Sequence, residues 1–223
     1  MNFEELRRTL VRTLELEGIV RSPLVKEALL NVPREEFVPP HLREYAYQDS
    51  PLPIGYGQTI SAPHMVAIMT EELRVQPGNR VLEVGTGSGY QAAVLAYIAS
   101  RSPRGHVVTI ERIPQLAVFA KQNLEHAGLY HYVTLLVGDG SVGAPSYGPF
   151  DRIIVTAAAP KIPRALVEQL KPGGRMVIPV GSRWSQVLAV VTKSEDGSIR
   201  TEYGTPCVFV PLIGREGWKH NII

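Results

Sequence analysis

The stretch that decides the fold is 81–89, VLEVGTGSG. Its first half, VLEV, is apolar enough for a buried strand, and glycines then stand at alternate positions, Gly85, Gly87 and Gly89. Apolar residues at helical spacing follow over 92–98. A strand, a glycine turn and a helix in that order predict a nucleotide-binding corner. Glycine lets a ligand approach the main chain, and the helix start offers unpaired N–H groups.

Strand and helix patterns alternate on the C-terminal side of this corner. The expected strands are 80–84, 106–111, 132–137, 151–156 and 175–180, with helices at 89–99, 113–127 and 163–170. This alternation predicts a doubly wound, mostly parallel α/β sheet of the Rossmann-like type. A turn is expected at 171–174, LysProGlyGly. Further strands are expected at 185–193, 199–203 and 206–212, as antiparallel strands that close the sheet.

The N-terminal part has a different character. Helices are expected from Phe3 to about Gly18 and from a Ser22 N-cap to Leu30. Residues 31–60 are rich in Pro, Tyr and Gly and too aromatic for a disordered linker, so we expect an ordered arm, followed by a helix from Pro63. The expected division is an N-terminal helical extension with a substrate-covering arm, 1–60, and a Rossmann-like domain with a C-terminal hairpin, 61–223.

Composition excludes several classes of function. The 223 residues are 44% hydrophobic and 20% charged, which fits a globular protein. A net charge of +2 favours neither a nucleic acid nor a membrane as partner. The single cysteine excludes an internal disulfide and a cysteine metal cluster, and no metal site is expected. Without a signal-peptide pattern or an apolar run of spanning length, the expected location is cytoplasmic.

The glycine spacing indicates which nucleotide binds. A dinucleotide fingerprint reads G-x-G-x-x-G, whereas here the third glycine comes one residue earlier, and Glu83 precedes the first. Glu83 suits a ligand ammonium, held directly or through water. Glu111 stands 22 residues after Gly89 and suits a ribose, and Asp139 suits an adenine amino group. An amino-acid ammonium joined to adenosine describes S-adenosylmethionine. The alternative is an ordinary turn with strand-end acids, above all for Asp139 in Gly-Asp-Gly.

Two segments bear on the methyl acceptor. The fourth strand ends in 156–160, ThrAlaAlaAlaPro, which offers no acceptor for an N–H donor and so disfavours adenine or glutamine nitrogen as the target. The absence of a basic stripe disfavours RNA and DNA. Residues 58–65, GlnThrIleSerAlaProHisMet, place polar groups at a helix N-terminus, which suits an anion. The alternative there is that Ser61 caps the helix begun by Pro63.

Motifs along nearly the whole chain carry a family resemblance. GQTISAPHM, LEVGTGSGY, IERI, GDG, VTAAAP and FVPLIG follow in order between about residue 15 and about residue 218. In this set the chain resembles the protein-L-isoaspartate O-methyltransferases. The resemblance implies a class I S-adenosylmethionine-dependent fold with a rearranged order of the last strands. It also implies methylation of the free α-carboxylate of L-isoaspartyl and, less well, D-aspartyl residues in damaged proteins. The ester then closes to a succinimide and returns partly to aspartate, and S-adenosylhomocysteine is the other product.

The resemblance also implies roles for particular residues. Ser61 is the catalytic serine, and substrate contacts are expected from Thr59, Ser61, His64, Val208 and Val210, with 208–213 lying beside the peptide as a short strand. The expected cofactor contacts are Gln58, Thr59, Ile60, Ser61, His64, Glu83, Gly85, Gly87, Gly89, Glu111, Asp139, Gly140 and Ile213. The expected partners are damaged proteins, and a monomer is favoured.

Physical chemistry limits what Ser61 has to do. A carboxylate is ionised at pH 7 and needs no general base, so Ser61 is expected to orient the acceptor as a hydrogen-bond donor. Three alternatives stay open. GQTISAPHM speaks against a small-molecule or RNA methyltransferase, and the glycine spacing with Glu83 speaks against an NAD-dependent oxidoreductase. The presence of Ser61 speaks against a non-catalytic cofactor-binding module.

Overall fold

The computed structural model of the chain describes residues 1–219. Its α-helices are α1 (Phe3–Leu16), α2 (Pro23–Asn31), α3 (Pro63–Leu73), α4 (Tyr90–Ala99), α5 (Pro114–His126) and α6 (Arg164–Glu168). Its strands are β1 (Leu52–Gly55), β2 (Gln58–Ile60), β3 (Arg80–Val84), β4 (His106–Glu111), β5 (Val133–Val137), β6 (Phe150–Val155), β7 (Leu170–Gly181), β8 (Gln186–Lys193) and β9 (Ile199–Cys207). Short 3-10 helices are η1 (Arg34–Phe37), η2 (Pro40–Tyr45), η3 (Tyr130–Tyr132), η4 (Gly140–Val142) and η5 (Pro145–Tyr147).

The main sheet has the strand order β5-β4-β3-β6-β7-β8-β9. The strands β5, β4, β3, β6 and β7 pair in parallel. At the β7 edge, β8 pairs antiparallel with β7, and β9 pairs antiparallel with β8. Strand order reverses around β3, which lies between β4 and β6. A reversal of this kind leaves a crevice at the carboxyl ends of the strands, where α/β proteins bind their ligands. The predicted Rossmann-like sheet with antiparallel C-terminal strands is therefore confirmed.

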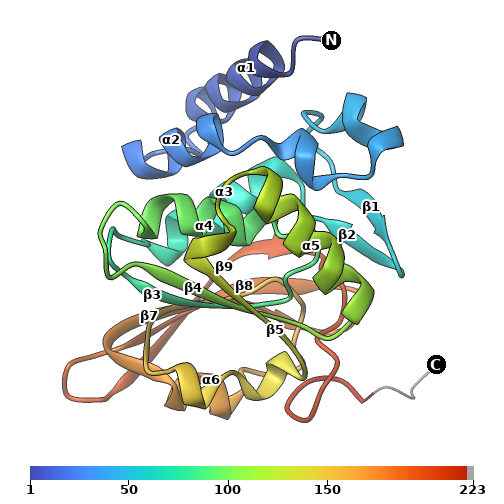
Figure 1. Cartoon of the computed structure of the whole chain (residues 1–223). Coiled ribbons are helices and arrows are strands. Elements are labelled where there is room, and N and C mark those ends of the chain that lie inside the picture. Colours follow the sequence, from blue (N-terminus) through green and yellow to red (C-terminus); the bar gives the residue numbers. More distant parts are fainter. Residues whose placement is uncertain (220–223) are drawn as a thin grey trace.

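The helices form layers on the sheet (Figure 1). Helices α3, α4 and α5 cover one face, α1 and α2 lie outside them as a further layer, and α6 covers part of the opposite face. Strand residues alternate between the two cores, with Val81 packing on the α4 side and Leu82 on the α6 side. The α4-side core also includes Val11, Leu14 and Phe37, so the N-terminal segment packs into the same core as the sheet.

Local signals set the helix starts near the N-terminus. The Ser22 side chain accepts a hydrogen bond from the Val25 amide at 3.2 Å, so the predicted N-cap with proline at the next position is formed. Helix α3 has Ala62 as its N-cap, and no side chain caps it. The alternative in which Ser61 caps this helix is therefore wrong.

The C-terminal strands correct one prediction. A strand over 206–212 is not formed, because β9 already ends at Cys207 and the chain then leaves the sheet. Pro211 lacks the N–H that a ladder needs. The segment 208–213 instead pairs with the loop after β6, where the Ala158 amide donates to the Val210 carbonyl and the Leu212 amide to the Ala158 carbonyl, each at 2.8 Å.

A second correction concerns the expected turn at 171–174. This segment lies inside β7, between the pairs Phe150–Leu170 and Arg152–Arg175, where the register shifts. Gly173 has a φ of +73°, so the glycines provide a local break in the strand without ending it. β7 is therefore longer than the predicted 175–180.

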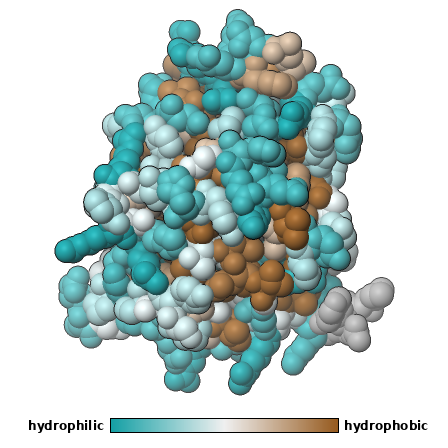
Figure 2. All heavy atoms as spheres, in the orientation of Figure 1, coloured by the Kyte–Doolittle hydropathy of each residue, from teal (hydrophilic) through white to brown (hydrophobic). Residues whose placement is uncertain are grey.

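The visible surface is mainly hydrophilic, with an apolar patch in the region of β5 (Figure 2). This agrees with the position of β5 at the sheet edge, where Val137 is 56% exposed. Within residues 1–219, none of the helices combines the length and apolar character of a membrane span. In the same range, no group of three or more His, Cys, Asp and Glu side chains is placed to hold a metal ion.

Candidate active site

A cavity that is partly open to solvent lies at the carboxyl ends of β3, β4 and β6. The empty space within it, including the part open to solvent, is about 770 Å³. It is lined by the end of the arm, the glycine turn, the first turn of α4, the end of β4, the start of η4, the loop after β6 and the C-terminal segment. Its lining residues include Gln58, Thr59, Ile60, Ser61, Gly85, Thr86, Gly87, Ser88, Tyr90, Gln91, Glu111, Gly140, Thr156, Ala157, Val210 and Ile213.

The glycine turn forms the floor of the cavity. Gly85 has a φ of +97°, and a Cβ atom at this position would lie 2.5 Å from the Thr156 hydroxyl oxygen. That hydroxyl donates to the Gly85 carbonyl at 2.6 Å and so fixes the turn against the end of β6. Only glycine satisfies both the backbone conformation and the close approach. The turn therefore presents bare main chain to whatever enters the cavity.

Glu111 occupies the position expected of a ribose acceptor. Its two carboxylate oxygens accept hydrogen bonds from the Gly87 and Ile113 amides, both at 2.9 Å. The side chain lines the cavity, although its residue is only 5% exposed. Each carboxylate oxygen has a further lone pair, so the fixed carboxylate can accept from a vicinal diol without moving.

Glu83 is fully buried and does not belong to the cavity wall. Its Oε2 accepts from the Thr109 hydroxyl at 2.5 Å, and the Thr109 hydroxyl lies 2.6 Å from that of Thr86, which lines the cavity. Its Oε1 has no partner in the described residues. Burial raises the pKa of Glu83 to about 8; the Thr109 hydrogen bond lowers it, and the Glu111 carboxylate raises it further. Glu83 thus reaches the cavity through two hydroxyl groups.

The end of the arm forms the opposite wall. Strand β2 and the residue after it place Gln58, Thr59, Ile60 and Ser61 along the cavity. The hairpin β1–β2 also lies over the glycine turn, because a Cβ atom on Gly87 would meet Ile54 at 3.3 Å. His64 does not line the cavity; its amide and its Nδ1 both lie 2.9 Å from an Asp49 carboxylate oxygen.

The C-terminal segment closes the cavity beside β6. Val210 and Ile213 line it, whereas Val208 is 75% exposed and does not. Of the small residues after β6, Ala157 lines the cavity, and the backbone of Ala158 holds the segment through Val210 and Leu212. The loop after β6 therefore presents the Thr156 hydroxyl and the Ala157 methyl to the cavity.

Gly140 and Asp139 have separate environments. Gly140 lines the cavity, and a Cβ atom there would lie 2.4 Å from a Val84 methyl. Asp139 is outside the wall: one of its oxygens accepts from the Ser141 amide and hydroxyl, and the other accepts from the Arg215 amide at 2.7 Å. Asp139 therefore joins the loop after β5 to the C-terminal segment.

The structure brings most of the predicted site residues to one cavity. Those outside its wall are His64, Glu83, Gly89, Asp139 and Val208. Sequence reasoning did not select Thr86, Tyr90 and Gln91, which also line it. Their position in the sequence could have identified them. Thr86 lies within the glycine turn, and Tyr90 and Gln91 begin the helix that follows it, whose first turn must face the ligand.

The fold and the cavity define an S-adenosylmethionine-dependent methyltransferase of the Rossmann-like class. The family model for protein-L-isoaspartate(D-aspartate) O-methyltransferase matches residues 5–217, and the chain belongs to that family. The fold, activity and methyl donor predicted from the sequence are thereby confirmed at the level of the family.

Individual relatives align with this chain along most of their length. The chain is 61% identical to the protein-L-isoaspartate O-methyltransferase of Hyperthermus butylicus, over 97% of this chain and 92% of the relative. The corresponding protein of Staphylothermus marinus is 60% identical, over 97% and 98%. A Plasmodium falciparum structure described as a protein-L-isoaspartate O-methyltransferase, in complex with S-adenosyl-L-homocysteine, is 28% identical. It superimposes with a TM-score of 0.84 and covers 93% of this chain and 98% of its own.

Proposed function

We propose that this cavity aligns S-adenosylmethionine with the free α-carboxylate of an L-isoaspartyl residue, and that Ser61 orients that carboxylate. The observation that carries the proposal is the single cavity lined by both Ser61 and Glu111, one from the arm and one from the end of β4. It has the two halves that a methyl transfer needs, a fixed site for the donor and a hydroxyl beside the acceptor.

The residues present fit the donor. The bare main chain at Gly85 and Gly87 leaves room for a ligand, and the Glu111 carboxylate is fixed at the position of a diol acceptor. Gly140 lines the cavity without a side chain, next to the apolar Val84, which leaves room for an adenine ring. Glu83, Gly89, Asp139 and His64 lie behind this first layer, and we propose that they hold the cofactor-binding segments in place or act through water.

S-adenosylmethionine supplies an activated methyl group on a positively charged sulfur. The protein then has no proton to remove, because the attacking carboxylate is already ionised at pH 7. What the chain contributes is alignment: Thr59 and Ser61 offer hydroxyl donors, and Ala157, Val210 and Ile213 give the cavity an apolar wall. Holding reactants in line can supply on the order of 7–11 kcal/mol of the barrier. Neutralisation of the carboxylate by the cationic donor also favours transfer wherever the two charges are shielded from water.

The test is the transfer of tritiated methyl from S-adenosylmethionine to an isoaspartyl peptide, with the normal aspartyl peptide as control. We expect label on the isoaspartyl peptide alone, as a base-labile ester. Equal label on both peptides would contradict the substrate assignment, and label that resists base would contradict the ester. The same assay with a D-aspartyl peptide tests the second substrate that we propose, at a lower rate.

The remaining proposals concern the setting of the enzyme. We propose that it acts as a monomer in the cytoplasm on damaged proteins, without a nucleic acid or membrane partner. The net charge of +2 supports the last part of this proposal, because such a charge gives no strong electrostatic attraction to a nucleic acid or to an anionic membrane surface. Light scattering at micromolar concentration checks the oligomeric state.

A further inference from the structure

A buried cation lies behind the proposed active site. Arg34, the first residue of η1, is 0% exposed and is among the largest fully buried side chains of the protein. Burial lowers the pKa of its guanidinium to about 10, against the opposing effect of Tyr90, Tyr47 and Asp49, so the group is charged at pH 7. A charge in a dry interior is costly unless several groups stabilise it. The groups that contact the Arg34 guanidinium therefore indicate its role.

The contacts of Arg34 go to backbone carbonyls and to one aromatic ring. Its Nε donates to the Ala46 carbonyl at 2.8 Å and its Nη2 to the Ser61 carbonyl at 2.7 Å. Its Cζ lies 5.0 Å from the centroid of the Tyr90 ring. The planar fork of a guanidinium fixes the relative positions of such partners, which an ammonium on a flexible stem does not.

Two of these three partners belong to the cavity wall. Ser61 and Tyr90 both line the cavity, from the arm and from the first turn of α4, and Ala46 follows η2 in the arm. Phe37 from the same 3-10 helix packs edge-on against Tyr90, with 5.5 Å between ring centroids. Arg34 therefore connects the arm, the proposed catalytic serine and the helix that follows the glycine turn.

We propose that Arg34 is a positioning residue for methyl transfer: through the Ser61 carbonyl it sets the backbone that carries the Ser61 hydroxyl, and through Tyr90 it sets that backbone against the glycine turn. The inference rests on the proposed role of Ser61. It concerns alignment, since Arg34 lies outside the cavity wall and touches neither reactant.

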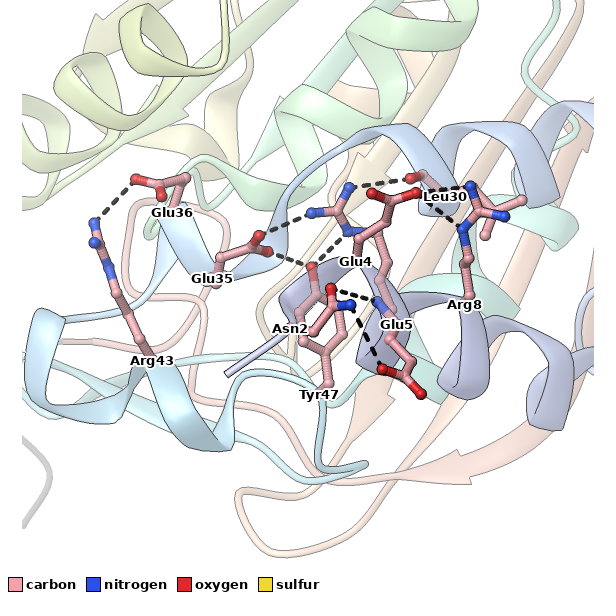
Figure 3. Close-up of polar contacts among 10 residues, drawn as sticks. Asn2, Glu4, Glu5, Arg8, Leu30, Glu35, Glu36, Arg43 and Tyr47 are labelled. Atoms are coloured by element: carbon pink, nitrogen blue, oxygen red, sulfur yellow. Dashed lines mark hydrogen bonds and ion pairs between the residues drawn. The ribbon is translucent and has the colours of Figure 1, made fainter.

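The chain provides a matched control in Arg7. Its guanidinium is also largely buried, with a side-chain exposure of 13%, and it holds the same arm through the Leu30 carbonyl, the Tyr47 hydroxyl and Glu35. Glu35 also accepts from the Tyr47 hydroxyl, as Figure 3 shows. None of these partners lines the main cavity. Loss of Arg7 loosens the arm without touching Ser61 or Tyr90.

The experiment compares Arg34→Lys with Arg7→Lys in the full-length protein. Steady-state methylation of an isoaspartyl peptide gives kcat and KM, calorimetry gives the Kd for S-adenosylhomocysteine, and thermal unfolding gives Tm. We expect kcat of Arg34→Lys to fall by 10-fold to roughly 100-fold, the size expected for a misplacement near 1 Å, while Kd changes less than about 3-fold. Arg7→Lys is expected to lower Tm with kcat within about 3-fold of the parent. Equal falls in kcat for both variants would overturn the proposal.

A double-mutant cycle with Ser61→Ala separates this inference from the proposed function. Ser61→Ala keeps the carbonyl that Arg34 binds and removes only the hydroxyl. If Arg34 acts through that hydroxyl, Arg34→Lys should cost little more in the Ser61→Ala background, whereas independent effects would multiply and overturn the inference. If Ser61→Ala alone leaves kcat unchanged, the role of Ser61 itself is wrong, and the inference falls with it. Should Arg34→Lys not fold, Arg34→Gln, which keeps an amide donor, is used with the same criteria.

Discussion

The glycine corner and the arm form opposite walls of one cavity, and they are built in different ways. The corner, 80–99, is continuous in sequence, and its shape follows from glycine conformations and main-chain hydrogen bonds. The arm, 31–62, consists of short 3-10 helices and a small hairpin; apolar residues such as Phe37 and Ile54 pack it into the core, and buried polar contacts between distant parts of the arm, such as Arg34 with Ser61, fix its path. We therefore assign the corner to the methyl donor, and we propose that the arm distinguishes the acceptor.

The largest effect is expected on cofactor binding, from a substitution that disrupts the glycine corner. Gly85→Ala places a Cβ 2.5 Å from the Thr156 hydroxyl oxygen in a backbone with φ of +97°. The conformation alone costs on the order of 1–2 kcal/mol, and the clash adds to it. We expect S-adenosylhomocysteine binding to weaken by more than about 100-fold in calorimetry, which corresponds to roughly 2.7 kcal/mol.

Gly57→Ala is the control for the conformation. Gly57 has a φ of +69° at the hairpin tip of the arm, and nothing lies within 4 Å of the position that a Cβ atom would take there. This variant should bind within about 5-fold of the parent, since it carries strain without a clash. Equal losses in the two variants would mean that the cavity does not depend on the close approach at Gly85.

The next largest effect is expected on kcat, from a substitution in the arm that leaves the glycine corner unchanged. Ser61→Ala should lower kcat by about 100-fold, the cost of losing alignment, with the Kd for S-adenosylhomocysteine nearly unchanged. Ser50→Ala, another serine of the arm that does not line the cavity, is the control and should leave both values unchanged. A parallel loss of kcat and affinity would show that Ser61 belongs to the donor site.

The same contrast explains what the sequence could predict. Strand β3, the glycine turn and α4 were predicted nearly to the residue, because apolar periodicity and glycine spacing are local signals. The Ser22 cap was predicted for the same reason. Arg34 and Asp49 carried no such signal, since their partners Ser61 and His64 lie 27 and 15 residues away. A buried cation bound to carbonyls has no pattern in the chain.

The C-terminal segment shows a case in which the local sequence pattern led to a wrong prediction. The apolar run at 206–212 was typical of a strand, and its local pattern favoured one. What decides its path is the loop after β6, whose Ala158 amide and carbonyl bind Val210 and Leu212. Partners of this kind depend on the assembled sheet, so local reasoning found the apolar residues and missed their pairing. Val208 then lies exposed beyond the cavity wall, and its contact with substrate stays a prediction.

A smaller effect on cofactor affinity is expected from Glu111, which lies at the end of β4 beside the glycine corner. Glu111→Ala removes the carboxylate that accepts from the Gly87 and Ile113 amides and leaves a diol without its acceptor. Hydrogen bonds to a charged group contribute about 1.5–3 kcal/mol, so the Kd for S-adenosylhomocysteine should rise at least about 10-fold. Glu125→Ala on the exposed side of α5 is the control. An unchanged Kd for Glu111→Ala would reduce Glu111 to a residue that only shapes the turn.

The last prediction concerns the stability of the folded protein and not cofactor binding or catalysis, and it involves the buried acid Glu83. Burial raises the pKa of Glu83 to about 8 from 4.5, so between these pH values the folded state keeps a proton that the unfolded state has released. Stability linked to Glu83 is therefore complete below the unfolded pKa and falls as pH rises towards 8, by up to about 1.4 kcal/mol per pH unit. Glu83→Gln carries no such proton. Urea unfolding at pH 5 and pH 8 should show the parent losing more stability than Glu83→Gln over this interval. Equal losses would mean that Glu83 is already ionised in the folded protein at these pH values.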